Sequence, residues 1–88
     1  MSQQATVIMY RTRFCIYCVM AERLLKSKKI EFEQIDVSGQ PEMRRELRER
    51  TGRRTVPQIF INEQSVGGFD DISALDRAGQ LDTMLGLV

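Results

Sequence analysis

The stretch Ala5-Thr6-Val7-Ile8-Met9-Tyr10, followed closely by Cys15-Ile16-Tyr17-Cys18, decides the fold of this 88-residue chain. The first six residues are apolar or β-branched on both faces, which predicts a buried central strand that is covered on each side. From Ile16 to Lys29 the apolar residues recur every three or four positions, which predicts a helix. The two cysteines therefore lie where a strand passes into a helix.

Strand and helix patterns alternate again further along the chain. Residues 30–37 return to strand character, although Phe32 and Ile35 are an odd number apart, so both faces are covered or a bulge intervenes. Pro41 favours the start of a helix and Gly52 favours its end. Residues 41–51 are therefore predicted to form a highly charged and mostly exposed helix.

The last third of the chain predicts a β-hairpin and two short helices. Residues 58–61 and 65–66 flank the short connection Asn62-Glu63-Gln64, and the helices that follow are broken at Gly79 and finished at Gly86. The predicted order is β-α-β-α-β-β-α, with a short extra helix at the end. The helix between the first two strands predicts that they form a parallel pair, joined by a right-handed crossover. We expect one α/β domain over residues 1–88, with a four-stranded mixed sheet flanked by helices on both faces.

Charge and composition exclude several functions. Thirteen Lys and Arg residues against twelve Asp and Glu give a net charge of +1, without a block of like charges, so neither nucleic acid nor a membrane surface is expected as a partner. The chain has no histidine, which removes Ser-His and Cys-His catalytic pairs. The start Met1-Ser2-Gln3-Gln4 lacks the pattern of a signal peptide, so we expect a cytoplasmic protein, and its size favours a monomer.

Cys15 and Cys18 carry the chemistry that the sequence predicts. A thiolate at the start of a helix accepts unpaired backbone N–H groups and lies at the positive end of the helix dipole, so its pKa falls below that of a free cysteine. Arg11 and Arg13 add positive charge nearby. We expect Cys15 to attack and Cys18 to resolve the mixed disulfide. The alternative, a zinc site, would need a second chain or carboxylate ligands.

Two further motifs each allow a structural and a functional interpretation. Thr55-Val56-Pro57 is either a loop proline before a strand, or a cis proline that leaves the backbone of Val56 free to pair with an extended, peptide-like ligand. Gly67-Gly68-Phe69-Asp70-Asp71 is either a tight turn with a helix cap, or an anion site whose backbone N–H groups hold a carboxylate while Asp70 accepts an ammonium group.

Together, Cys15-Ile16-Tyr17-Cys18, Thr55-Val56-Pro57 and Gly67-Gly68-Phe69-Asp70-Asp71 resemble a glutaredoxin of the dithiol, Cys-x-x-Cys class, and the resemblance extends from Thr6 to about Leu85. Residues 52–61 are especially similar to that family. The resemblance implies the thioredoxin-like fold, a cis Pro57, and glutathione as reductant and co-substrate, with no metal. It also implies that the partners are disulfide-containing or glutathionylated proteins.

The resemblance assigns roles residue by residue. Cys15 would attack a glutathionylated protein or a small disulfide, and a second glutathione, or Cys18, would then release the product. Val56 would pair with the cysteinyl part of glutathione, Asp70 with the backbone of Phe69 would hold its γ-glutamyl end, and Arg54 would reach its glycyl carboxylate. The complete set of residues implied to bind glutathione is Arg11, Thr12, Arg13, Tyr17, Arg54, Thr55, Val56, Pro57, Gly68, Phe69, Asp70 and Asp71.

This chain departs from the family pattern at two positions. Ile16 stands where the family usually has proline, and Thr12 stands where many members have lysine, with Arg11 and Arg13 on either side of it. An alternative function therefore stays open, in which Cys15 of two chains and two glutathione molecules hold a [2Fe–2S] cluster. Recharging by thioredoxin reductase is a further alternative, which Asp70, Asp71 and Arg54 disfavour.

The predicted helix at residues 41–51 carries arginines that no motif above explains. The run Arg44-Arg45 and Arg48-Glu49-Arg50 alternates with acidic residues, so it is either a solvated helix face or a docking surface for an acidic partner.

Overall fold

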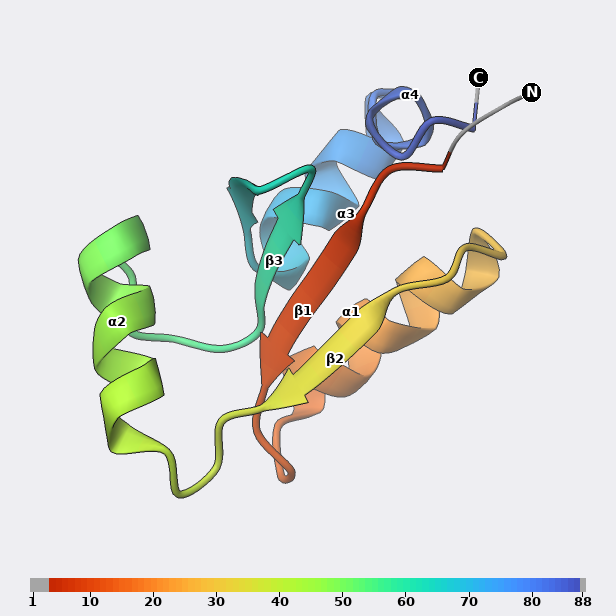
Figure 1. Ribbon diagram of the computed structural model, residues 1–88. Helices are drawn as coiled ribbons and strands as arrows, with labels where there is room; N and C mark the ends of the chain where they lie inside the picture. Colours follow the sequence, from red (N-terminus) through yellow and green to blue (C-terminus); the bar gives the residue numbers. More distant parts are fainter. Residues whose placement is uncertain (1–3, 88) are drawn as a thin grey trace.

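The structure is a computed structural model that describes residues 4–87, and within them strands and helices follow the predicted order (Figure 1). The sheet has the strand order β2-β1-β3-β4, with β1 parallel to β2 and antiparallel to β3, and with β4 antiparallel to β3. The predicted four-stranded mixed sheet is confirmed. The elements are β1 (Val7–Arg11), α1 (Ile16–Ser27), β2 (Glu33–Asp36), α2 (Pro41–Thr51), β3 (Gln58–Ile61), β4 (Gln64–Gly67), α3 (Phe69–Arg77) and α4 (Leu81–Met84).

Helices cover both faces of the sheet, as the sequence predicts, but unequally. On one face α1, α3 and α4 pack against alternate residues of β1 and β3, including Met9 and Ile59, which are fully buried. On the other face α2 packs through Leu47 against Val37 and Phe60. Figure 1 shows α2 standing apart from the three other helices, on the opposite side of the strands.

The spacing of Phe32 and Ile35 has a simple explanation in this arrangement. Phe32 packs against the cluster beneath α1, whereas Ile35 packs against the cluster beneath α2, so both faces are covered. The strand itself is shorter than the predicted 30–37. Only Glu33–Asp36 pair with β1 as strand. The strand stops at Asp36 because β1 ends at Arg11, and it does not start earlier because the backbone of Glu31 bonds to the side chain of Gln4.

Two other predicted boundaries differ from the observed ones. The first helix ends at Ser27 rather than Lys29, because Lys29 adopts a left-handed backbone conformation with a φ of 57°. The hairpin connection is two residues long rather than three, because Asn62 and Glu63 both have positive φ and β4 already begins at Gln64. The helix over Pro41–Thr51 and the break at Gly79 are confirmed.

Candidate active site

The turn between β1 and α1 places Cys15 at the start of the helix. Cys15 is the N-cap residue, with extended backbone, and its Sγ accepts a hydrogen bond of 3.1 Å from the backbone N–H of Cys18. A side chain that caps a helix in this way satisfies one of the N–H groups that the first turn leaves unpaired. The sulfur of Cys15 therefore sits in the positive field of the helix N-terminus.

Cys15 and Cys18 are joined by a disulfide, with their Cα atoms 5.2 Å apart, so the structure shows the oxidised form. The two residues differ in exposure: Cys18 is fully buried, whereas Cys15 is partly exposed at the surface. Only the sulfur of Cys15 therefore presents itself to a molecule that approaches from solvent. Beside it lie exposed apolar side chains, of which Phe14 is almost fully exposed.

The loop before β3 lies next to Cys15. The peptide bond between Val56 and Pro57 is cis, and the carbonyl oxygen of Val56 lies 3.7 Å from Sγ of Cys15. The loop is fixed by Gln58, whose buried side chain donates to the carbonyl of Arg53 at 3.0 Å and accepts from the hydroxyl of Thr51 at 3.0 Å. Because both ends of the Gln58 amide are bonded inside the protein, this loop has a defined position next to Cys15.

The start of α3 forms the third wall of the site. The backbone N–H of Gly68 donates to the Asp71 carboxylate at 2.9 Å, and Arg53 forms an ion pair with the same carboxylate at 2.8 Å. The N–H of Gly68, with the Arg53 guanidinium second, lowers the pKa of Asp71 below its ordinary value. Gly67 has a φ of 100°, and a Cβ atom there would overlap the Asp71 carboxylate, so the turn requires glycine.

These three segments enclose a groove of about 300 Å³ next to the disulfide. The rings of Tyr17 and Phe69 face each other across one side of it, with their centroids 6.4 Å apart. The groove brings together eight of the residues predicted to bind glutathione and adds Arg53. Its lining consists of Tyr17, Arg53, Thr55, Val56, Pro57, Gly68, Phe69, Asp70 and Asp71.

The remaining predicted residues lie outside the lining of this groove. Arg11 forms an ion pair with Glu22 at 3.4 Å, and the exposed Arg13 forms one with Asp36 at 3.5 Å. The carbonyl of Thr12 accepts a hydrogen bond of 3.3 Å from the side chain of Arg11. The neighbouring Arg54 lines a separate hollow along α2.

Three residues of the site are given no functional role by the sequence analysis. Arg53 enters the groove through its ion pair with Asp71, Gln58 holds the loop from beneath, and Phe14 is exposed beside Cys15. For Phe14 the sequence does contain a signal: a bulky apolar residue directly before a reactive cysteine, in a turn between a strand and a helix, is expected to lie at the surface near that cysteine. For Gln58 no such signal exists, because glutamine is usually an exposed residue.

Metal-ligating side chains do not gather around the disulfide or elsewhere within residues 4–87: no three acidic or cysteine side chains lie close enough together to hold an ion. In the same part of the chain, every helix is too short or too polar to span a bilayer.

A disulfide of Cys-x-x-Cys spacing at the N-terminus of a helix, on a sheet of this topology, defines a thiol-disulfide oxidoreductase with the thioredoxin-like fold. Comparison with known proteins makes this more specific. The glutaredoxin family model matches residues 7–66. A glutaredoxin of Pseudomonas aeruginosa is 49% identical over 79 residues, which cover 90% of this chain and 94% of the relative. The chain belongs to the glutaredoxin family.

Two solved structures show the same similarity in three dimensions. The solution structure of a glutaredoxin from Brucella melitensis has 48% sequence identity and a TM-score of 0.85, covering 96% of this chain and 91% of that one. The crystal structure of a buckwheat glutaredoxin–glutathione complex has 26% identity and a TM-score of 0.88, covering 92% and 76%. The predicted thioredoxin-like fold is thereby confirmed.

Proposed function

We propose that this protein uses glutathione to reduce protein disulfides and glutathione mixed disulfides, with Cys15 as the nucleophile and Cys18 as the resolving thiol. The observation that carries the proposal is the difference between the two sulfurs. Cys15 is partly exposed and lies beside a groove, whereas Cys18 is fully buried behind it. A buried thiol next to an exposed one can attack a mixed disulfide formed on its neighbour, but it cannot be the first to reach a large substrate.

With a glutathionylated protein, the Cys15 thiolate attacks the sulfur of the glutathionyl group. A bond forms between Cys15 and glutathione, the bond between glutathione and the protein breaks, and the protein leaves as a thiolate that takes up a proton. The thiolate of a second glutathione then attacks the adduct. Glutathione disulfide leaves, and the Cys15 thiolate is restored.

With an intraprotein disulfide, Cys15 forms a mixed disulfide with the protein, and the Cys18 thiolate attacks the sulfur of Cys15. The reduced protein leaves, and the Cys15–Cys18 disulfide forms, the state described above. Two glutathione molecules reduce this disulfide in turn and leave as glutathione disulfide. The N–H group of Cys18, which donates to Sγ of Cys15, would stabilise the thiolate that each cycle regenerates.

The groove supports glutathione as the co-substrate. The backbone of Val56 would pair with its cysteinyl part, as an edge strand pairs with an extended peptide. Asp70, at the exposed start of α3, would accept the γ-glutamyl ammonium group, and the N–H groups of that helix start would take the adjacent carboxylate. The glycyl carboxylate would then point along the loop toward Arg54. The buckwheat relative is itself described as a complex with glutathione.

The test is the rate at which the wild-type protein reduces a small glutathione mixed disulfide, coupled to glutathione reductase. We expect turnover in the wild type and none in Cys15→Ser, because no other group within reach can form the glutathione adduct. In Cys18→Ser this reaction should continue, while reduction of an intraprotein disulfide should fall by at least tenfold. Equal losses in both variants would contradict the roles given to the two thiols.

The same protein also tests the [2Fe–2S] alternative. If the wild type is no faster than Cys15→Ser, and if anaerobic treatment with iron, sulfide and glutathione gives visible absorption, the function is cluster binding rather than reduction.

A further inference from the structure

The turn that leads into the attacking cysteine has no buried side chain of its own. It covers residues 12–14, between the end of β1 and the N-cap residue Cys15. Arg13 and Phe14 are both exposed, and Thr12 is half-buried. Burial of apolar side chains therefore contributes little to holding this turn, and its position depends on its polar contacts.

Two hydrogen bonds hold the backbone of the turn. The carbonyl of Thr12 accepts from the side chain of Arg11 at 3.3 Å, and the backbone N–H of Arg13 donates to the hydroxyl oxygen of Ser38 at 3.1 Å. The first bond is local, whereas the second links the turn to a segment that is distant in the sequence. Because Arg13 precedes Cys15 by two residues, the bond to Ser38 fixes the chain directly before the proposed nucleophile.

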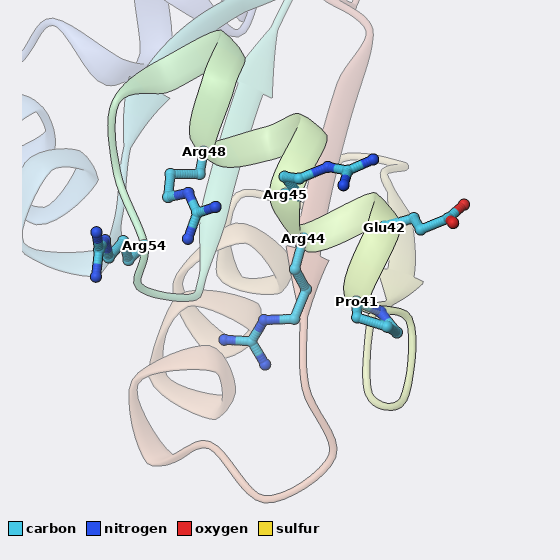
Figure 2. Close-up of a pocket in the computed structure, with 6 residues that line it drawn as sticks. All are labelled: Pro41, Glu42, Arg44, Arg45, Arg48 and Arg54. Carbon is cyan, nitrogen blue, oxygen red and sulfur yellow. The ribbon is translucent and has the colours of Figure 1, made fainter.

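The segment that carries Ser38 is well anchored. Ser38 follows Val37, which is fully buried and whose N–H donates to the carbonyl of Arg11 at 2.8 Å. The chain then turns, and the N–H of Gln40 donates back to the carbonyl of Val37 at 3.0 Å. Figure 2 shows Pro41 directly beyond this turn, at the start of α2. The Ser38 hydroxyl therefore offers the N–H of Arg13 an acceptor in a defined position.

Asp36 orients this hydroxyl. The Asp36 carboxylate accepts from the backbone N–H of Ser38 at 2.8 Å and forms an ion pair with the Arg13 guanidinium at 3.5 Å. The Ser38 hydroxyl, with the Ser38 N–H second, lowers the pKa of Asp36 below its ordinary value. A hydroxyl that donates its proton to Asp36 keeps its lone pairs for the N–H of Arg13. Arg13 is therefore held at two points, its N–H group and its guanidinium.

The position of the turn bears on the sulfur of Cys15. The N–H of Cys18 donates to Sγ of Cys15 at 3.1 Å, which requires the extended backbone that Cys15 adopts as N-cap, with φ −138° and ψ 108°. If the chain before Cys15 drifts, these angles change and the hydrogen bond is lost for part of the time. A thiolate that loses this bond also moves out of the positive field of the helix N-terminus.

We propose that Ser38 is a positioning residue for the attacking thiol, because its hydroxyl holds the backbone before Cys15 and thereby keeps the Cys15 sulfur at the N-terminus of α1. The inference rests on the proposed function, since it concerns the nucleophile of the same site. Neither Ser38 nor Asp36 lines the groove beside the disulfide. Their effect on the chemistry therefore passes through Arg13.

The experiment measures the pKa of the Cys15 thiol in reduced wild type and in Ser38→Ala, from the pH dependence of alkylation by iodoacetamide. Alkylation reports on Cys15, because Cys18 is fully buried. In Ser38→Ala we expect the pKa of Cys15 to rise by about half a unit, which lowers the alkylation rate by about threefold at a pH below the pKa. The kcat/KM for a small glutathione mixed disulfide should fall by a similar factor.

Two further variants separate positioning from a general loss of structure. Ser38→Thr keeps the hydroxyl, so it should restore the wild-type pKa of Cys15. The matched control is Ser27→Ala, which removes an exposed hydroxyl that donates to the carbonyl of Leu24 at 2.6 Å, at the other end of α1 from Cys15. This control should leave the pKa of Cys15 unchanged. An unshifted pKa in Ser38→Ala, or the same shift in Ser38→Ala and Ser38→Thr, would overturn the proposal.

The alkylation measurement also separates this proposal from the redox function, because it requires no glutathione. If the pKa shifts in Ser38→Ala while the wild type turns over no glutathione mixed disulfide, the proposed function fails and the positioning role stands. If the wild type turns over the mixed disulfide and Ser38→Ala matches it in both pKa and rate, the positioning role fails and the proposed function stands.

Discussion

The two faces of the sheet are built very differently. Beneath α1, α3 and α4 lies an extensive cluster of buried side chains, whereas beneath α2 the buried cluster consists of Val37, Leu47 and Phe60. The helices on the first face each bury at least one residue completely, and α1 alone buries Cys18, Ala21 and Leu25. On the second face Leu47 is the single buried residue of α2.

Because of this difference, one face of the sheet supports the redox site, whereas the other face holds only α2. Helix α1, which begins at the cysteines, and helix α3, which borders the groove, both pack on the large cluster. The core that stabilises the fold therefore also fixes the geometry of the redox site. Helix α2 needs only a narrow apolar stripe to stay in place, and the rest of its surface is exposed. That surface carries the charged residues of the helix. The predictions below test how far the separation holds.

The largest effect is expected from Leu25→Ala. Leu25 is fully buried in α1, and truncating it leaves a cavity in the large cluster, so the free energy of unfolding should fall by about 2–5 kcal/mol. Urea denaturation measures the loss. Leu25→Met, which nearly conserves the side-chain volume, serves as the control and should cost less than about 1.5 kcal/mol. Similar losses in both variants would show that packing at this position does not decide stability.

A smaller effect is expected from Leu47→Ala, on the other face. Leu47 is 3% exposed and has few buried neighbours, so its loss should cost about 2 kcal/mol, near the lower end of the range for such truncations. Hydrogen exchange should accelerate mainly in the amides of α2, because local opening of this helix then costs little. The partly exposed Met43, on the same helix, provides the control: Met43→Ala should change stability by less than about 1 kcal/mol.

If Leu47→Ala destabilises the protein as much as Leu25→Ala does, the two faces are not energetically distinct. The comparison of exchange rates adds a second criterion, because a global loss of protection in Leu47→Ala would mean that α2 unfolds only together with the rest of the chain.

What the sequence could predict follows from the range over which each signal acts. Periodicity is local, so it located the strand before Cys15, the helix after it, and the exposed helix over Pro41–Thr51. Strand ends were less accurate, because the length of β2 depends on its pairing with β1, a partner that is distant in sequence. The two-residue turn at Asn62 and Glu63 escaped prediction for a related reason. Asn62 is held by hydrogen bonds with Thr6, at the far end of the chain.

The groove shows the same limit at the level of single residues. Arg53 and Arg54 are identical and adjacent, yet Arg53 pairs with Asp71 in the groove whereas Arg54 lines the hollow along α2. Neighbouring residues in a non-helical segment point to different sides, and no pattern in the sequence states which side faces the cysteines. The position of Gln58 was likewise invisible, because its burial depends on finding two hydrogen-bond partners at once.

Gln58→Leu tests that polar support and should have a smaller effect than either leucine truncation. The substitution removes the donor that the buried Gln58 side chain supplies to the carbonyl of Arg53, so it should cost about 1–2 kcal/mol. The loop that carries Val56 should loosen, which we expect to raise the KM for glutathione more than it lowers kcat. The exposed Gln64 of β4 supplies the control, and Gln64→Leu should leave both stability and KM nearly unchanged.

The smallest effect concerns the carboxylate of Asp71 and depends on pH. Its pKa is lowered in the folded protein by the N–H of Gly68 and by Arg53, so its ionised form stabilises the fold. The stabilisation is therefore complete well above the ordinary value of 3.8 and is lost as the pH falls through the lower, folded value. Near neutral pH, Asp71→Ala should cost about 1 kcal/mol, since it removes both the cap and the ion pair.

Asp71→Asn separates the two contributions, because the amide oxygen can still accept from Gly68 while the charge is gone. Near neutral pH, Asp71→Asn should lower the free energy of unfolding by less than Asp71→Ala does. Added salt should reduce the difference in unfolding free energy between Asp71→Asn and wild type, because the ion pair with Arg53 is partly exposed. As the pH falls below the lowered, folded pKa of Asp71, wild type and Asp71→Asn should converge in stability. A difference that persists unchanged from pH 7 to pH 2 would show that the charge contributes nothing, and that the start of α3 is held by its hydrogen bond alone.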